Sequence, residues 1–283
     1  MSGRASSRRA TPGGRWRHLP AALMSLAFVL PLVLMVGGSL REPGAPPPRG
    51  PEVVPSSPTL EPYARAFELV NLPRATVNSL IVVAFAVPLT VVVASWAAFA
   101  MSRLPRRAAG AIIGVSLVSL MVPVTALLVS RFAMFRTLLL TDTFVPLIAP
   151  ALIGTSPFYV LIYYWSFRRL PQDLFDASRL EGLGPFAVWR RVAMPLVRPV
   201  TVAVAVLAFA ATWGNFLDPL IYLFDQERFT LPLALRSLAL VGPQDASIFL
   251  AGAVAAVAPV VGAFLYVQRF FLQEHREAGW LGR

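Results

Sequence analysis

The sequence of 283 residues contains no cysteine and no lysine, and its only histidines are His18 and His275. Without cysteine, neither a disulfide nor a thiolate-bound metal can form. Without lysine, the chain cannot supply the essential lysine of a G-x-x-x-x-G-K-[ST] phosphate-binding loop, and the zinc-protease motif H-E-x-x-H is also absent. We therefore expect no catalytic residue, no metal site and no cofactor bound by this chain.

Charged residues are also scarce. They make up 14% of the chain, whereas a soluble domain has about 25%, and six long apolar runs contain none. Each run is near or above the roughly 20 residues that a helix needs to cross the hydrocarbon core, where backbone groups must satisfy one another. We predict an all-α polytopic membrane protein with six transmembrane helices over residues 19–272. The runs cover residues 19–40, 75–102, 108–130, 143–167, 199–217 and 246–268.

The charges that remain are divided unevenly between the two sides of such a membrane protein. With the N-terminus inside, the inner segments hold 17 arginines and 5 acidic residues, and the outer ones hold 8 arginines and 9 acidic residues. This division follows the positive-inside rule, so the basic surplus reflects topology and not nucleic-acid binding. We expect a bacterial cytoplasmic (inner) membrane protein with two cytoplasmic tails, 1–18 and 273–283, in contact with membrane lipid. The run at 19–40 is longer than a usual signal-peptide core, so we favour a retained first helix.

The outer segment 41–74 contains nine prolines and is expected to be extended, because an interior proline removes a helix hydrogen bond. A short helix is expected only over 59–68. Inside, the polar stretch 168–198 lies between two apolar runs and predicts a helix–turn–helix. Its first helix spans 171–180, Gly182 suits the left-handed residue that ends it, and Gly184-Pro185 begins the second.

The second helix of this hairpin is amphipathic. Its apolar face contains Val188, Trp189, Val192, Ala193 and Leu196, and Arg190 and Arg191 lie opposite. Two interpretations follow from the pattern: a hairpin lying on lipid headgroups, or a docking element for a cytoplasmic partner.

The order of residues in this hairpin resembles the EAA loop of binding-protein-dependent ABC importer permeases. Asp176-Ala177-Ser178 stands for E-A-A, Glu181-Gly182 for D-G, and Met194-Pro195-Leu196 for L-P-L. Asp, Ser and Glu replace the family's Glu, Ala and Asp, and the shorter Asp176 puts in doubt an ion pair made by the family glutamate. The resemblance implies that the loop couples to a cytoplasmic ATPase. The implied coupling residues are Asp176, Ala177, Ser178, Glu181, Gly182 and Pro195.

Further motifs resemble the carbohydrate class of these permeases, as in the G-type subunit of the maltose permease. They are "TLEPYARAFE" (59–68), "WGNFLDPL" (213–220) and the tripeptide Gln268-Arg269-Phe270, which ends in an aromatic residue. The remaining C-terminal residues depart from the pattern. The resemblance implies alternating access with a second homologous permease subunit, two copies of an ATPase that bind ATP and Mg, and an extracellular or periplasmic solute-binding protein.

Polar and aromatic groups at membrane depth often line a transport path. Trp213, Asn215, Phe216 and Asp218 end the fifth run and are candidate contacts for a carbohydrate, although packing against the partner permease would also explain them. A charged solute such as a glycerol phosphate remains an alternative substrate. A stand-alone secondary transporter or channel is a further alternative. A membrane-embedded transferase would need clustered acids or histidines near one interface, and the sequence offers none.

Overall fold

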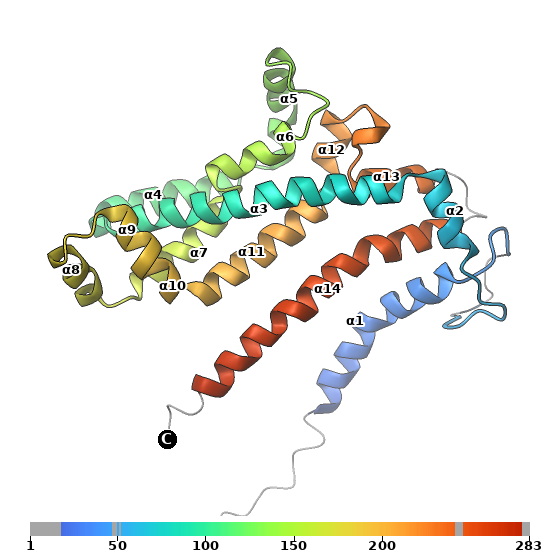
Figure 1. The fold of residues 1–283 in the computed structure, drawn as a ribbon, viewed down its shortest axis with the longest axis horizontal. Helices are drawn as coiled ribbons and strands as arrows, with labels where there is room; N and C mark the ends of the chain where they lie inside the picture. The colour runs from blue at the N-terminus through green and yellow to red at the C-terminus, as the bar shows by residue number, and fades with distance from the viewer. Residues whose placement is uncertain (1–17, 47–49, 51, 241–245, 279–283) are drawn as a thin grey trace, which may run out of the picture. The chain divides into compact units, whose positions relative to one another are not determined.

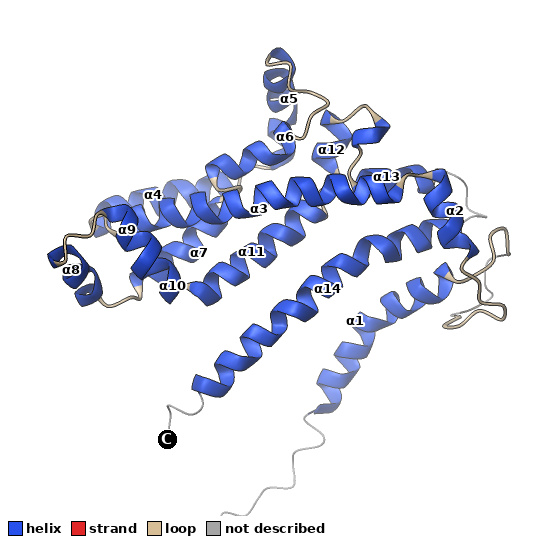
Figure 2. Cartoon of the chain, in the orientation of Figure 1, coloured by secondary structure: helices blue, strands red, loops and turns tan. Residues whose placement is uncertain are grey.

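The computed structural model describes residues 18–46, 50, 52–240 and 246–278, and within these ranges it contains helices and loops but no strand (Figure 2). This confirms the all-α class. The chain forms two compact units, one of residues 1–66 with 241–254 and the other of residues 67–240 with 255–283. In the described part, four helical segments are long and apolar enough to cross a membrane, or up to six if each of two bent pairs counts as one span.

The first unit contains α1 (His18–Ser39) and most of α2 (Glu61–Leu69), which confirms the short helix expected near 59–68. Most large apolar side chains of α1 are exposed, as in a helix that faces lipid. Ser39 Oγ lies 2.8 Å from Tyr63 Oη and joins the two helices. A Cβ at Gly37 would lie 2.3 Å from the Val53 carbonyl oxygen, so the 41–60 loop packs where no side chain fits.

The second unit is built on α3 (Leu72–Ser102), which runs alongside α7 (Pro157–Arg168) and α11 (Arg198–Trp213) (Figure 1). With 31 residues, α3 is about 46 Å long and exceeds the hydrocarbon thickness. Ala94, Ala98 and Ser95 are fully buried along α3. Small residues at these positions let the backbones of neighbouring membrane helices approach closely.

The apolar run at 108–130 forms a broken helix, which differs from the single span expected. It comprises α4 (Arg106–Leu120), η1 (Val124–Leu127) and α5 (Leu128–Thr137), with a bend of 83° at the break. Pro123 explains the break, because it has no N–H to donate to the preceding turn and restricts the residue before it.

The run at 143–167 is also built in pieces, although together they are long enough for one span. It contains α6 (Val145–Ile148), the 3₁₀ turn η2 (Ala149–Ile153) and α7. A proline stands in the first turn of each piece, where the missing N–H costs nothing. Ser156 then caps α7, because its Oγ accepts the Phe158 N–H at 3.2 Å.

The fifth run forms one short helix, α11 (Arg198–Trp213). With 16 residues α11 is about 24 Å long, and it bends by 87° from the preceding segment Pro185–Leu196. Beyond it lie α12 (Leu217–Tyr222), η4 (Gln226–Arg228) and α13 (Leu231–Ala239). The last helix, α14 (Ala246–Ala278), continues past the expected membrane boundary at 272.

The polar stretch 168–198 contains α8 (Gln172–Leu180), α9 (Pro185–Val188), the π-helical turn η3 (Trp189–Ala193) and α10 (Met194–Leu196). We call residues 171–197 the hairpin. Its Phe175 is buried beside Phe99 of α3, with ring centroids 6.2 Å apart, and Phe99 in turn contacts Phe167 of α7 at 5.7 Å. The hairpin is therefore packed onto the helix bundle through aromatic side chains.

Candidate functional site

The turn of the hairpin is a Schellman motif, the six-residue helix ending closed by a left-handed residue. Gly182 has φ +74°, which confirms the left-handed glycine expected at this position. The Leu183 N–H donates to the Ser178 carbonyl at 3.1 Å, and the Gly182 N–H donates to the Arg179 carbonyl at 2.9 Å. The end of α8 and the start of α9 are therefore held at a defined angle by backbone hydrogen bonds.

The second half of the hairpin departs from the regular helical period. The Met194 N–H donates to the carbonyl of Trp189, five residues earlier, which is the hydrogen bond of a π turn. The turn inserts one extra residue, so the apolar face shifts at its end: Leu196 is 49% exposed and Val197 is 3% exposed. Of the other residues expected on this face, Val188, Trp189 and Ala193 are buried and Val192 is half-buried, and the two arginines are exposed.

The six residues named for coupling divide into two groups. Ser178 is buried, and its Oγ donates to the Leu174 carbonyl at 2.6 Å, so it packs inside the hairpin. The others are exposed along the hairpin: Asp176, Ala177, Glu181, Gly182 and Pro195. Asp176 Oδ1 lies 3.6 Å from Arg179 Nη1, and both side chains are more than half exposed.

A second candidate site is a polar cleft of about 170 Å³ between α3, the α6–η2 segment and the α11–α12 junction. Its polar lining consists of hydroxyl, amide and carboxylate groups from Ser79, Thr155, Thr212, Asn215, Asp218 and Thr230. The Thr230 hydroxyl is buried and has no hydrogen-bond partner among the described residues. Groups of this kind can hydrogen-bond the hydroxyls of a solute.

Two of the four predicted path residues line this cleft, Asn215 and Asp218. They are linked, because the Asn215 Nδ2 donates to Asp218 Oδ2 at 2.8 Å and the Asp218 N–H donates to Asn215 Oδ1 at 3.2 Å. Asp218 also pairs with Arg131 of α5 at 3.3 Å. The carboxylate is thus oriented from two sides.

The other two path residues lie elsewhere. Trp213 is 4% exposed, and its Nε1 donates to the Ala256 carbonyl of α14 at 3.0 Å. Phe216 is 37% exposed and does not line the cleft. Asn78 of α3 lies outside the cleft lining and uses its amide to donate to the carbonyls of Glu227 and Phe229.

Residues 69–271 match the family described as the inner membrane component of binding-protein-dependent transport systems. The chain belongs to this family. It is therefore a multi-pass permease of the inner membrane and a transport component, not a stand-alone transporter or channel. Proteins of this family work generally with a partner permease, an ATPase and a solute-binding protein.

Two curated relatives and one solved structure illustrate the similarity. The permease is 33% identical over 156 residues to the arabinooligosaccharide transport permease AraQ of Halalkalibacterium halodurans, a match that covers 55% of each chain. It is 28% identical over 265 residues to the trehalose transport permease SugB of Mycobacterium tuberculosis, covering 93% of this chain and 94% of that one. A bacterial ABC transporter that imports the acidic polysaccharide alginate shares the fold, with a TM-score of 0.74, 19% identity and coverage of 95% and 100%.

The geometry adds residues of the permease that sequence reasoning missed. Leu180 lies at the turn of the hairpin, outside the apolar runs, and 91% of its surface is exposed. Its neighbours in sequence are charged, and an apolar residue next to a glycine turn is the signal that could have identified it. Arg131 and Thr155 carried no such signal, because they lie far in sequence from the 213–220 motif: Thr155 lines the cleft, and Arg131 pairs with Asp218.

Proposed function

We propose that this permease forms half of the translocation pathway of an ABC importer for a carbohydrate. A second, homologous permease supplies the other half, and two ATPase copies bind ATP and Mg and drive alternating access. In the proposed topology the chain crosses the membrane six times, each bent pair counts as one span, and both termini and the hairpin lie on the ATPase side. An extracellular or periplasmic binding protein delivers the substrate from the opposite side.

The observation that carries this proposal is the exposed end of the hairpin. Leu180 is almost fully exposed there, flanked by Asp176, Arg179 and Glu181. An apolar side chain surrounded by charges is the pattern of an anchor residue that enters a partner's pocket within a polar rim. The alternative of a hairpin that only lies on lipid is less well supported, because the acids at this end would face anionic headgroups.

The carbohydrate assignment is supported by two independent observations. The relatives named above transport arabinooligosaccharides and trehalose. The polar cleft is lined by neutral hydroxyl and amide groups, and its single carboxylate is already paired with Arg131. A cleft of this composition suits a neutral polyol better than a phosphate ester, for which an unpaired cation would be expected.

The substrate class is tested by reconstituting the complete importer with its binding protein and measuring substrate-stimulated ATP hydrolysis. We expect stimulation by one or more sugars in a broad panel. Stimulation by glycerol phosphates, amino acids or peptides with no response to any sugar would contradict the carbohydrate assignment and leave the importer assignment standing.

The coupling role is tested with Asp176→Lys and Leu180→Ser, which change the exposed end of the hairpin without touching its buried side. We expect both variants to retain folding and lose transport, with less ATPase copurifying with the permease. Glu61→Lys provides the control, because it changes an exposed acid on α2, at the opposite side of the membrane in the proposed topology. Wild-type transport in both hairpin variants would exclude the coupling role.

A further inference from the structure

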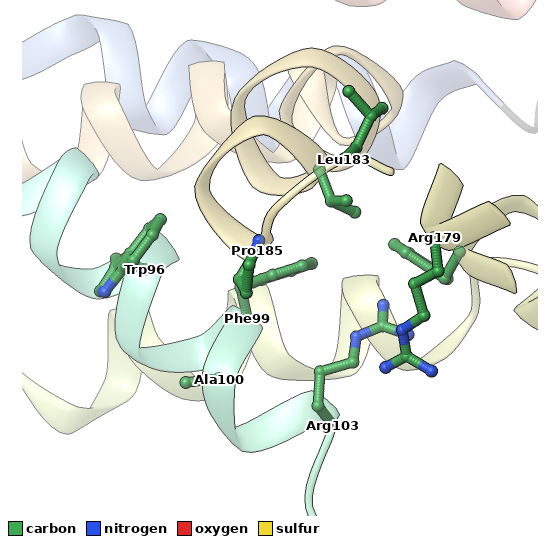
Figure 3. A pocket seen from close by; sticks show the side chains of 9 residues that line it. Trp96, Phe99, Ala100, Arg103, Arg179, Leu183 and Pro185 are labelled. Carbon is green, nitrogen blue, oxygen red and sulfur yellow. The ribbon is translucent and has the colours of Figure 1, made fainter. Parts of the chain in front are cut away.

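A cavity of about 440 Å³ lies between the end of α3 and the hairpin, and the hairpin residues Arg179 and Leu183 form part of its lining. Figure 3 shows its two ends: the guanidinium groups of Arg103 and Arg179 lie together on one side, and the ring of Trp96 lies on the other. The walls between them are apolar and include Phe99, Leu183 and Val188. We call this space the α3–hairpin cavity. It has a cationic end and an aromatic end.

The cationic end is incompletely satisfied. The Arg103 guanidinium stacks on the ring of Phe175, with Cζ 3.3 Å from the centroid, and its Nε and Nη2 are buried without a hydrogen-bond partner among the described residues. The neighbouring Arg179 is exposed. Its ion-pair partner among the described residues is Asp176, which is also exposed and lies 3.6 Å away. Burial, and then the charges of Arg179 and Arg168, lower the pKa of Arg103, and Asp176 opposes this effect. A group with two or more anionic oxygens would relieve both the repulsion and the unpaired donors.

The aromatic end lies deeper along the membrane helix. Trp96 precedes Arg103 by seven residues on α3, which corresponds to about 10 Å along the axis. Arg103 follows directly after the apolar span Leu72–Ser102, so Trp96 lies inside that span. The Trp96 ring is 40% exposed and contacts Phe186 and Trp189 of the hairpin, with ring centroids 5.4 Å and 5.0 Å away. The aromatic end therefore lies within the apolar span of α3, and the cationic end lies directly beyond it.

We propose that the α3–hairpin cavity binds an anionic phospholipid of the adjoining leaflet, with its phosphate at Arg103 and Arg179 and an acyl chain along Trp96. An acidic segment of a soluble partner would satisfy the arginines but would leave the aromatic end, which lies within the apolar span of α3, without an apolar occupant. A lipid satisfies both, because it combines a phosphate with a long apolar chain, and basic pockets between membrane helices recognise such headgroups. The bound lipid would contact both α3 and the hairpin, and its phosphate would accept hydrogen bonds from the Arg103 donors that have no partner among the described residues.

The proposal is tested on the purified full-length permease, incubated in detergent with equal amounts of phosphatidylglycerol and phosphatidylcholine. Native mass spectrometry then gives the ratio of the two bound lipids, and the measurement needs neither the ATPase nor transport. We expect the wild type to prefer phosphatidylglycerol, and an excess of inorganic phosphate not to displace it. Arg103→Gln and Arg179→Gln should each reduce this preference about fivefold, the effect of about one headgroup contact.

The matched controls are Arg106→Gln and Arg107→Gln, which remove the same charge from the first turn of the neighbouring α4 but do not line the cavity. Both should keep the wild-type preference. Ala100→Phe fills the cavity while both arginines remain, so it should also reduce lipid binding, and this variant guards against misfolding of the arginine variants. In wild type, phosphatidylglycerol with brominated acyl chains should quench tryptophan fluorescence more than it does in Trp96→Phe.

Three outcomes would overturn the proposal. The first is an equal loss of preference in Arg106→Gln and Arg107→Gln, which would indicate that general surface charge causes the lipid preference. The second is an unchanged preference in the two arginine variants and Ala100→Phe. The third is an unchanged lipid preference together with loss of ATPase copurification in the arginine variants, which would assign the cavity to a segment of the protein partner.

Discussion

Arg131 of α5 forms an ion pair with Asp218 of α12, which lines the polar cleft, and Arg131 Nη1 lies 3.3 Å from Asp218 Oδ1. The side chains of Arg131 and Asp218 are 20% and 13% exposed. Arg131 also lies near the ring of Tyr222, with Cζ 5.9 Å from the centroid. The pair joins α5, the second half of the broken helix, to α12, which follows α11. It thus fixes α5 to the carboxylate that lines the cleft we propose for the substrate.

Removing one member of this pair should be more harmful than removing both. Asp218→Asn leaves the Arg131 charge buried without its partner, and we expect it to lower the free energy of unfolding by about 1–3 kcal/mol. The double variant Arg131→Gln/Asp218→Asn should recover part of that loss. Thermal unfolding of the detergent-purified permease measures both, with Arg136→Gln, an exposed position on the same helix, as the control. A double variant less stable than either single variant would contradict the role of the pair.

The two glycines at the hairpin turn provide a second prediction, because both have room for a Cβ but their backbone φ angles differ. Neither Gly182 nor Gly184 has an atom within 4 Å of an added Cβ, but φ is +74° at Gly182 and −69° at Gly184. Gly182→Ala should therefore cost about 1 kcal/mol, and Gly184→Ala should be neutral. Gly182→Val should in addition impair transport, because a β-branched residue resists the left-handed angle more strongly.

These variants are best compared by hydrogen exchange of residues 172–188 and by transport in the reconstituted importer. Equal protection of the hairpin in the two alanine variants would show that the left-handed angle is not required for the turn.

Local features of this hairpin could be predicted from sequence, because each depends on a few neighbouring residues. The helix from 172 to 180, the left-handed Gly182 and the start at Pro185 were all readable from proline and glycine positions. The burial of Val197 in place of Leu196 was not, because the prediction assumed a period of 3.6 residues and the π turn at Trp189–Ala193 inserts one more. Nothing in the local composition announces that insertion.

The cleft shows a different limit. Asn215 and Asp218 were identified from one short motif, but their environment depends on Arg131 and Thr155, which lie far away in sequence. Trp213 belongs to the same motif and points to α14, where it donates a hydrogen bond to the Ala256 carbonyl. A motif therefore locates a segment, and only tertiary packing decides which of its side chains face the cleft.

The proposed topology gives a third prediction, and the lack of native cysteine makes it testable without background labelling. Cysteines introduced at Ser57 and Gln226, both exposed, should react with a membrane-impermeant maleimide in intact cells. A cysteine at the exposed Arg190 of the hairpin should react only after the cells are permeabilised. The reverse pattern at all three positions would invert the orientation and separate the hairpin from a cytoplasmic ATPase.

Asp142 connects two loops on the side opposite the hairpin in this topology. Its Oδ1 accepts the N–H groups of Phe224 and Asp225 at 3.0 Å and 3.1 Å, and Arg228 Nη1 lies 3.0 Å from its Oδ2. Partial burial acts to raise the pKa of Asp142, but the two backbone hydrogen bonds and Arg228 together outweigh it, so the pKa is lowered from its ordinary value of 3.8. The carboxylate is thus stabilised in its charged form by the folded loops.

The sign of this shift sets the last prediction. A carboxylate with a lowered pKa in the folded protein contributes stability that is fully present above its unfolded pKa, about 3.9, and is lost as the pH falls through the folded value. Hydrogen exchange of residues 223–229, corrected for intrinsic rates, should therefore be unchanged between neutral pH and about pH 5, and protection should fall only below about pH 4. Asp142→Asn keeps an oxygen for the two N–H groups but loses the Arg228 ion pair, so its protection should be lower than that of the wild type above about pH 4 and should approach it at lower pH. Glu227→Gln removes a charge from the same loop and leaves the Asp142 contacts in place, so it should follow the wild type. Loss of wild-type protection already near pH 5 would show that Asp142 does not hold these loops together.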